Sequence, residues 1–291
     1  MKKRIILISI SLLLLTCACD STKSSDDFTL EGFDLVWHDE FDGEELNEEY
    51  WNYMIGDGTS YGNPGWGNSE AQYYKKENVH LEDGKLVISA IKEKQGANNY
   101  TSARISTANK VKTKYGRIEA KISLPQVEGL WPAFWMLPES DTPYGSWASS
   151  GEIDIMEARG RVNDMTSAAL HYGEVGSSTY QTRTHILRES TIEDYHIYAL
   201  EWEELKMSWY VDDDLFFTMD NHSDVRGQKW YTTADLDSFT APFDWDFHIL
   251  LNMAVGGHFD GYRLPPDDFT SADMKVDYVR IYKFKEVNNE N

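Results

Sequence analysis

The chain has 291 residues and a formal net charge of −22, and 13% of its residues are aromatic, including ten tryptophans. So acidic a surface repels phosphate and sulfate polymers, which disfavours nucleic acid and heavily sulfated polysaccharides as partners. A neutral polymer fits better. Indole rings stack on the C–H faces of sugars, although core packing is an equal alternative for any single tryptophan.

The N-terminus is typical of an export signal. Three basic residues precede an apolar run at 5–15 that is too short to span a membrane. Cys19 follows Ala18, a small residue that suits cleavage, and this pattern resembles the bacterial lipoprotein signal, in which the mature N-terminal cysteine carries a lipid. We expect a signal peptide at 1–18, a flexible tether at 19–33 and lipidation of Cys19 on an exported, membrane-anchored protein. A plainly secreted protein is the alternative.

Alternation of apolar and polar residues dominates the rest of the chain. Residues 115–124 alternate in this way and predict a half-buried strand, and Asp83-Gly84 between two short apolar runs predicts a hairpin. Further strands are expected at 195–202, 206–211, 248–255 and 275–284. Because no long, capped helical period is present, we expect one all-β domain over residues 34–285, a sandwich or jelly roll, followed by a polar tail at 286–291.

The most informative stretch, GEIDIMEARG at 151–160, places three carboxylates within six residues of an otherwise apolar run. Burying three acids together is costly unless they are used or paired. In a regular strand Glu152 and Asp154 share one face, and Glu157 points to the other. A β-bulge at Ile155-Met156 brings Glu157 back beside them.

Two adjacent carboxyl groups suit a retaining glycosidase, in which one attacks the anomeric carbon and the other protonates the leaving oxygen. Asp154 between them is expected to hold a shared proton or to bond the nucleophile, which keeps Glu152 ionised while like-charge repulsion keeps Glu157 protonated. The alternative for such a pattern alone is an acidic edge strand that forms surface ion pairs with Arg159 and Arg161.

The 151–160 stretch also resembles the active-site strand of glycoside hydrolase family 16, in the bulged form of laminarinase-like members, which are endo-β-1,3-glucanases. The stretches that agree with this resemblance extend over most of the chain: WGNSEAQYY at 66–74, TSARIST at 101–107, LWPAFWMLP at 130–138, LNMAVGG at 251–257 and VDYVRIY at 276–282.

The resemblance implies a β-jelly roll of two curved antiparallel sheets, with substrate across the concave face. It also implies retention through a covalent glycosyl-enzyme, with Glu152 as nucleophile, Asp154 as assisting acid and Glu157 as acid/base. No cofactor is expected for catalysis. The expected substrate is a β-1,3-glucan or a mixed-linkage β-1,3/1,4-glucan, and a monomer is expected.

Trp131 and Trp135 lie four residues apart, so a strand would place both on one side, facing the groove. The resemblance places substrate contacts at Asn68, Glu70 and Arg104, and it places His171 near the acid/base. Trp147 lies in a loop that would shape one end of the groove. One departure from the family pattern is His258-Phe259 after Gly256-Gly257, where laminarinases often carry a tryptophan.

The eight histidines show no zinc-binding spacing. Many family members bind a structural calcium ion, and the resemblance offers Glu40, the Gly84 carbonyl and Asp277 as ligands. Surface acids without a metal are the alternative.

Two other functions stay open at this stage. One is a related hydrolase acting on a marine galactan such as agarose or carrageenan. The other is a glucan-binding surface lipoprotein without turnover, although such relatives typically lose the catalytic acids that this chain keeps.

Overall fold

The computed structural model describes residues 28–223 and 227–286. The expected signal peptide, Cys19, most of the expected tether and residues 287–291 lie outside them. Within the described ranges, no helix combines the length and apolar character that crossing a membrane requires. The first strand begins at Phe33.

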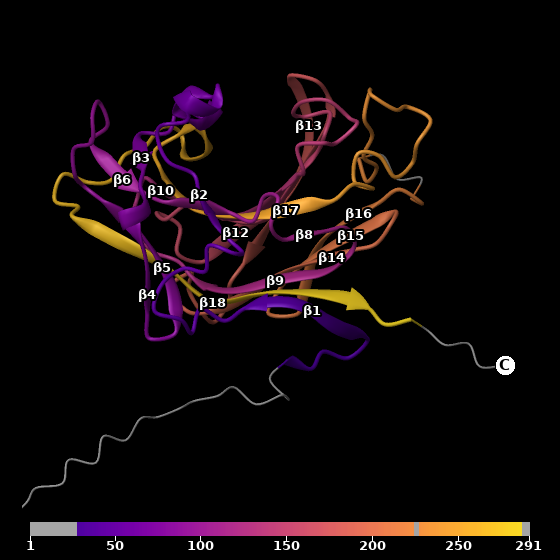
Figure 1. The fold of residues 1–291 in the computed structure, drawn as a ribbon, viewed down its shortest axis with the longest axis horizontal. Coiled ribbons are helices and arrows are strands. Elements are labelled where there is room, and N and C mark those ends of the chain that lie inside the picture. The colour runs from indigo at the N-terminus through magenta and orange to yellow at the C-terminus, as the bar shows by residue number, and fades with distance from the viewer. Residues whose placement is uncertain (1–27, 224–226, 287–291) are drawn as a thin grey trace, which may run out of the picture.

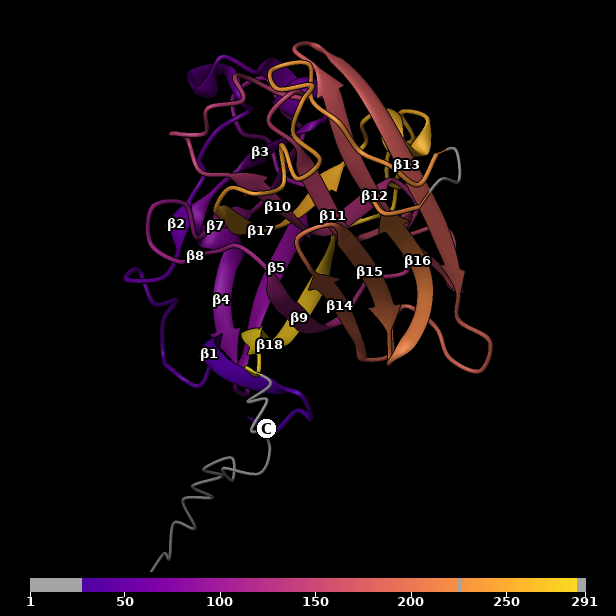
Figure 2. The same ribbon diagram turned by 90° about the vertical axis from the view of Figure 1, so that its right-hand side faces the viewer.

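Two sheets pack face to face as a jelly-roll β-sandwich, and Figure 1 shows these two curved layers from the side. The eight-stranded sheet has the order β13 (Ser177–Ile186), β12 (Met165–Glu174), β11 (Glu152–Ala158), β10 (Leu130–Pro138), β17 (Phe247–Val255), β7 (Arg104–Ser106) and β2 (Asn52–Tyr53), with β8 (Lys112–Thr113) beside β17. Figure 2 shows β13 to β10 side by side.

The ten-stranded sheet has the order β16 (Asp214–Asp220), β15 (Lys206–Val211), β14 (His196–Trp202), β9 (Gly116–Ser123), β18 (Ser271–Phe284), β5 (Lys85–Ile91), β6 (Tyr100–Ser102) and β3 (Gln72–Tyr74). β1 (Phe33–Asp39) pairs with β18, and β4 (Val79–Glu82) pairs with β5. Short 3₁₀ helices lie in the connections: η2 (Thr59–Tyr61), η3 (Pro64–Gly67), η4 (Lys76–Asn78) and η5 (His258–Asp260). β3 and β6 pair in parallel, and the other strand ladders in the described ranges are antiparallel.

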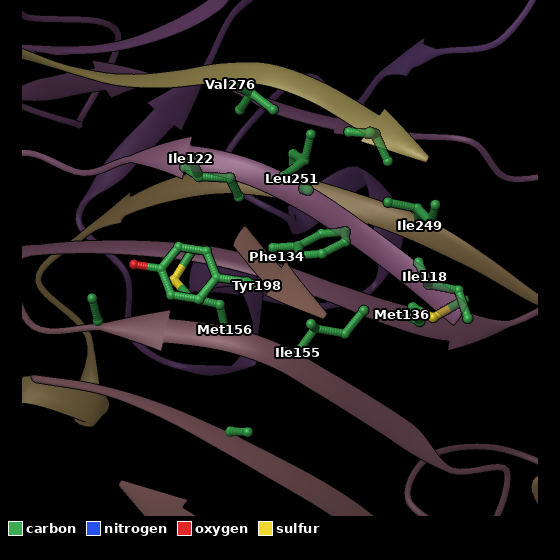
Figure 3. Packing of buried hydrophobic residues seen from close by; sticks show 14 of the residues in the cluster. Ile118, Ile122, Phe134, Met136, Ile155, Met156, Tyr198, Ile249, Leu251 and Val276 are labelled. Carbon is green, nitrogen blue, oxygen red and sulfur yellow. The ribbon is translucent and has the colours of Figure 1, made fainter. Parts of the chain in front are cut away.

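The core lies between the sheets because each strand turns alternate side chains inward. Ile118 and Ile122 of β9 meet Phe134 and Met136 of β10 across the interface, and all four are fully buried. Figure 3 shows these side chains interleaved. Since β10 gives its even-numbered residues to this core, its odd-numbered residues face the other side of the eight-stranded sheet.

The predicted hairpin is confirmed: Asp83 and Gly84 join β4 to β5 with φ of 52° and 67°. Both φ values are positive, as a two-residue turn of type I′ requires. The strands predicted at 195–202, 206–211, 248–255 and 275–284 are found as β14, β15, β17 and β18, the last of which starts four residues earlier than predicted.

The polar face of β9 differs from the expectation of a half-buried strand. Arg117 and Glu119 are 4% and 5% exposed. They pair with each other at 2.8 Å between Nε and Oε2, and Glu201 of β14 accepts a further bond from Arg117 at 3.1 Å. Matched charges allow these side chains to be buried, a condition that alternation alone does not reveal.

Candidate functional site

β11 contains the predicted bulge. Asp154 pairs with Ala169 of β12, and the next pair joins Glu157 to Ser167, so two residues of β11 stand opposite one residue of β12. Ile155 and Met156, the bulged residues, point into the core at 2% and 0% exposure. The three acids therefore occupy one face of the eight-stranded sheet.

The Trp209 indole of β15 reaches across the core to the bulge. Its Nε1 donates to the carbonyl oxygen of Asp154 at 3.1 Å. This bond satisfies a backbone acceptor that the irregular ladder leaves available, and it links the catalytic strand to the opposite sheet.

Residues opposite one another in neighbouring strands share a face, so the register maps the surface around the acids. Two rows cross the strands, the first with Arg104, Asn252, Ala133, Glu157 and Ser167, and the second with Ser106, Leu250, Trp135, Asp154 and Ala169. Ala133 and Ser167 flank Glu157, and Ala169 lies on the β12 side of Asp154, whereas Trp135 stands on its β10 side. The small side chains leave room for a sugar ring to approach the carboxylates.

Glu152 begins β11, and its carboxylate accepts a hydrogen bond from the Trp147 indole, with 2.7 Å between Nε1 and Oε2. Burial and then the charge of Asp154 raise the pKa of Glu152 to about 7. The charge of His171, the Trp147 bond and the charge of Arg104 oppose this rise. Near neutral pH a substantial fraction of Glu152 is therefore ionised, as a nucleophile must be.

Glu157 accepts a hydrogen bond from the Trp131 indole, with 2.9 Å between Nε1 and Oε1. Burial and then the charge of Asp154 raise the pKa of Glu157 to about 8, and Glu152 adds a smaller rise. Burial and like charge thus raise both glutamate pKa values, so the crowded group retains a proton near neutral pH, as a general acid beside an ionised nucleophile requires.

The buried Asp154 carboxylate lies 3.2 Å from His171 Nε2, and His171 Nδ1 lies 3.0 Å from the Ser178 hydroxyl. Burial alone would lower the pKa of His171, but its bond to Asp154 and the charges of all three acids raise it to about 9. His171 is directly opposite Glu152 in the register. This pairing gives Asp154 a protonated partner.

The expected role of Asp154 changes in one respect. Its contact is with His171, and its charge raises the pKa of Glu152, which opposes ionisation of that group. The groups that favour ionised Glu152 are His171, Trp147 and Arg104. The expectation that Asp154 keeps Glu152 ionised is therefore wrong, because like charges in a buried site raise one another's pKa.

At the other side of the groove, Arg104 lies between two indole rings, 4.7 Å from the Trp66 ring centre and 4.5 Å from that of Trp135. Its Nε is buried and has no hydrogen-bond partner within the described residues. Trp135 is held by Asn252, which accepts from Nε1 at 2.7 Å. The guanidinium is thus fixed by stacking and keeps donor capacity for a ligand.

Glu70 is buried next to Arg104, and burial raises its pKa. Its carboxylate accepts hydrogen bonds from Asn68 at 3.1 Å, Gln72 at 2.7 Å and Tyr74 at 3.0 Å. With these bonds Glu70 organises the segment that carries Asn68, the more exposed residue of the pair. Direct contact with a ligand therefore suits Asn68 better.

Comparison with known proteins agrees with this geometry. The model of a family described as glycosyl hydrolases family 16 matches residues 62–237, more than half of the chain. The chain belongs to glycosyl hydrolase family 16.

Relatives in this family match nearly the whole chain. A glucan endo-1,3-beta-glucosidase A1 of Niallia circulans is 41% identical in an alignment 274 positions long that covers 88% of this chain and 39% of that protein, so the chain spans about two fifths of that relative. A beta-glucanase of Rhodothermus marinus is 38% identical and is matched over 87% of this chain and 86% of its own length.

Among solved structures, the laminarinase catalytic domain of Thermotoga maritima superimposes with a TM-score of 0.77 at 36% identity, over 88% of this chain and all of that one. This superposition confirms the expected jelly-roll fold of family 16.

The departure from the family pattern at His258-Phe259 has a structural consequence. Phe259 stacks on Trp131 at 4.8 Å between ring centres and 18° between planes, and the Arg159 guanidinium covers Phe259 at 4.0 Å. The backbone nitrogen of His258 donates to the Asn68 carbonyl at 3.0 Å. η5 therefore holds the indole that bonds Glu157. Arg159, read from sequence as a possible surface partner of the acids, instead supports this stack.

The residues expected to hold calcium are engaged by cationic side chains. Arg280 donates to both oxygens of Glu40, at 2.8 and 3.0 Å, and Lys121 lies 3.0 Å from Asp277. A calcium ion bound to these acids would therefore have to replace both cationic contacts.

One group of acids and imidazoles in the described ranges has ligand atoms within 4.8 Å of one another, namely Glu152, Asp154 and His171 in the catalytic groove. A protonated imidazole has no lone pair to offer a metal. The pairing of His171 with Asp154 favours acid–base chemistry at this point.

Several residues that position the site were not predicted from the sequence: Trp209, Asn252, Gln72, Tyr74 and Ser178. Asn252 gave a usable signal, since it and His248 are the two polar residues of a strand whose other residues are apolar. Trp209 gave none, because its partner is a backbone atom of a strand 55 residues away.

Proposed function

We propose that this protein is a retaining endo-glycosidase that hydrolyses β-1,3-glucan or mixed-linkage β-1,3/1,4-glucan. The observation that carries the proposal is the bulged β11, which puts Glu152, Asp154 and Glu157 on one buried face, where burial and like charge raise the pKa of both glutamates. The names of the Niallia and Thermotoga relatives support the choice of β-1,3-glucan and of endo cleavage.

In the proposed reaction, ionised Glu152 attacks the anomeric carbon while Glu157 gives its proton to the leaving glycosidic oxygen. The product of this step is a covalent glycosyl-enzyme. Glu157, now ionised, then takes a proton from a water that attacks the same carbon, and Glu152 is released. The Trp147 and Trp131 indoles hydrogen-bond the carboxylates of Glu152 and Glu157, whose charges change during the reaction.

The groove residues supply binding without covalent chemistry. Trp135 offers a ring surface beside Asp154, and Arg104 and Asn68 offer donors to sugar hydroxyls. A neutral glucan also meets no charge penalty on a protein of net charge −22.

The test is reducing-sugar release from laminarin, barley mixed-linkage glucan, agarose and carrageenan, with Glu152→Gln as control. Release from laminarin that is lost in the variant is the expected result. Release from a galactan alone would overturn the substrate assignment and keep the two-glutamate chemistry. Binding of laminarin without release from any polymer would favour a glucan-binding protein.

Retention is tested separately by proton NMR of the first products. We expect the β-anomer to form first and to mutarotate afterwards. The α-anomer as first product would mean inversion and would exclude a covalent intermediate on Glu152.

We also propose that calcium stabilises the fold at Glu40, the Gly84 carbonyl and Asp277, although it would have to exchange with Arg280 and Lys121. A rise of the melting temperature with calcium that Asp277→Ala abolishes is expected. An unchanged melting temperature would leave these acids as partners of the two cations.

Export and lipid anchoring at Cys19, and a monomeric state, complete the proposal. The sequence of residues 1–19 supports the anchor. Fatty-acid labelling in cells that is lost in Cys19→Ala would support it, and release of unlabelled protein into the medium would favour simple secretion. Light scattering of the soluble domain measures the oligomeric state.

A further inference from the structure

The catalytic face of the eight-stranded sheet continues beyond the acids to the edge strand β13. Glu152 pairs with His171 of β12, and His171 pairs with Tyr180 of β13. These three side chains form one row on the groove face. Figure 1 shows β13 rising above the sheet on the side away from η2 and η3.

Tyr180 ends this row with an exposed aromatic ring. It is 57% exposed, and its ring stacks on His171 at 5.4 Å between centres with 28° between planes. Trp147 is 44% exposed and lies on another side of His171, 6.0 Å from its ring centre. Core packing accounts for neither exposed ring surface.

The floor beside these rings is made of small side chains. In the two neighbouring rows Asp154 is followed by Ala169 and Thr182, and Glu157 is followed by Ser167 and Thr184. The side chains on this side of the acids are therefore short, and the aromatic rings of Tyr180 and Trp147 lie beside them. A pyranose ring that lies flat needs such a combination of open floor and apolar ring face.

The β7 side of the groove has a different chemistry. There Arg104, Asn68 and Glu70 offer charged and amide groups, and the aromatic faces of Trp66 and Trp135 are partly taken by Arg104. Sugars on that side are recognised through hydroxyl contacts. On the β13 side, ring stacking is the main interaction that the described residues offer.

We propose that Tyr180, with the exposed face of Trp147, forms a stacking site for glucosyl units that extend past β12, on the opposite side of the scissile bond from Arg104. The proposal rests on the proposed function, since the occupant is the same glucan that the acids cleave. Tyr180 continues the row of side chains that begins at Glu152, so a glucan chain bound at the acids extends onto it.

The test compares wild type, Tyr180→Ala and Tyr180→Phe on β-1,3-linked gluco-oligosaccharides of increasing length. For chains long enough to reach β13, kcat/KM of Tyr180→Ala is expected to fall about five- to tenfold. The shortest cleaved oligosaccharide, which does not reach β13, should be unaffected. Tyr180→Phe keeps the ring and should behave as wild type at every length.

Leu215→Ala is the matched control, because Leu215 is 55% exposed on β16, the edge strand of the other sheet. It should leave kcat/KM unchanged. An equal loss at all lengths with a shifted pH profile would mean that Tyr180 acts through His171, and no loss at any length would mean that it contacts no sugar. Either result overturns the proposal.

Wild-type turnover of laminarin reports on the proposed function separately. If wild type does not cleave laminarin, titration of Glu152→Gln with the same oligosaccharides, with and without Tyr180→Ala, still decides the stacking site. Weaker binding of only the longer chains supports it, and equal binding overturns it.

Discussion

Both sheets bury carboxylates, and the neighbours of those carboxylates differ. On the ten-stranded sheet, Glu119 and Glu201 accept hydrogen bonds from Arg117, and Glu40, just after β1, accepts from Nε and Nη2 of Arg280. Each of these three acids meets a cation, and the charges of the acids raise the pKa of Arg117 and Arg280 against the effect of burial.

On the eight-stranded sheet the acids meet one another instead. Glu152 and Glu157 are bonded by neutral indoles, and the charge of Asp154 between them adds to burial in raising both pKa values. Among the residues that the structure describes, the cation within hydrogen-bond distance of this group is His171, which contacts Asp154. Buried carboxylates that are paired with a cation therefore stabilise the fold. Buried carboxylates that lie beside one another have raised pKa values and suit catalysis.

This comparison predicts opposite outcomes for matched substitutions, the largest in catalysis. Glu152→Gln keeps the shape of the side chain and removes the nucleophile, so kcat should fall by about four orders of magnitude or more. Thermal unfolding should show no loss of stability. If Glu152→Gln keeps its turnover or loses its stability, Glu152 is an acid that stabilises the fold, as Glu119 is.

The counterpart on the other sheet is Glu119→Gln. It leaves the buried Arg117 with only the more exposed Glu201 and Asp213, so the free energy of unfolding should fall by about 2–3 kcal/mol. The pH profile of kcat/KM should stay unchanged. Urea unfolding measures the change in the free energy of unfolding. A shift of the pH profile of kcat/KM would show that Glu119 influences the catalytic acids on the other sheet.

The parts of this comparison that were predictable from sequence are local ones. The three acids, the bulge and the pair Trp131 and Trp135 were predicted, because a strand fixes which neighbours share a face. The ion pair of Arg117 with Glu201 joins residues 84 positions apart. No periodicity encodes such a contact, so β9 was predicted to have a solvated face.

The same limit applied within the site. His171 was predicted near the acid/base, but its contact with Asp154 and its place opposite Glu152 depend on the register of β11 and β12. The departure at Phe259 was visible in the sequence, whereas its stacking on Trp131 required the fold. The pairing of His171 with Asp154, which raises the pKa of His171, was beyond sequence reasoning.

The third prediction concerns stability and pH. Burial and like charge raise the pKa of Glu157 to about 8, so the folded state binds a proton that the unfolded chain releases near pH 4.5. Its contribution to stability is complete below pH 4.5 and is lost as pH rises through 8. Glu157→Gln removes this loss and should be on the order of 1–2 kcal/mol more stable than wild type at pH 8.5, after allowance for solvent screening.

Unfolding free energies of both proteins at pH 5 and pH 8.5 measure this effect, and the two should converge at the lower pH. Glu119→Gln should be less stable than wild type at pH 8.5. If both variants change stability in the same direction, the contrast between paired and crowded acids does not hold.

The smallest predicted effect separates the roles of the two glutamates. The Trp147 bond lowers the pKa of Glu152 and the Trp131 bond lowers that of Glu157. Trp147→Phe should therefore move the acid limb of the kcat/KM profile upward, and Trp131→Phe should move the alkaline limb upward, each by about half to one pH unit. The first narrows the profile and the second widens it. The acid limb reports ionisation of the nucleophile, and the alkaline limb reports loss of the proton from the general acid. If Trp147→Phe instead moved the alkaline limb and Trp131→Phe the acid limb, Glu157 would be the nucleophile and Glu152 the general acid.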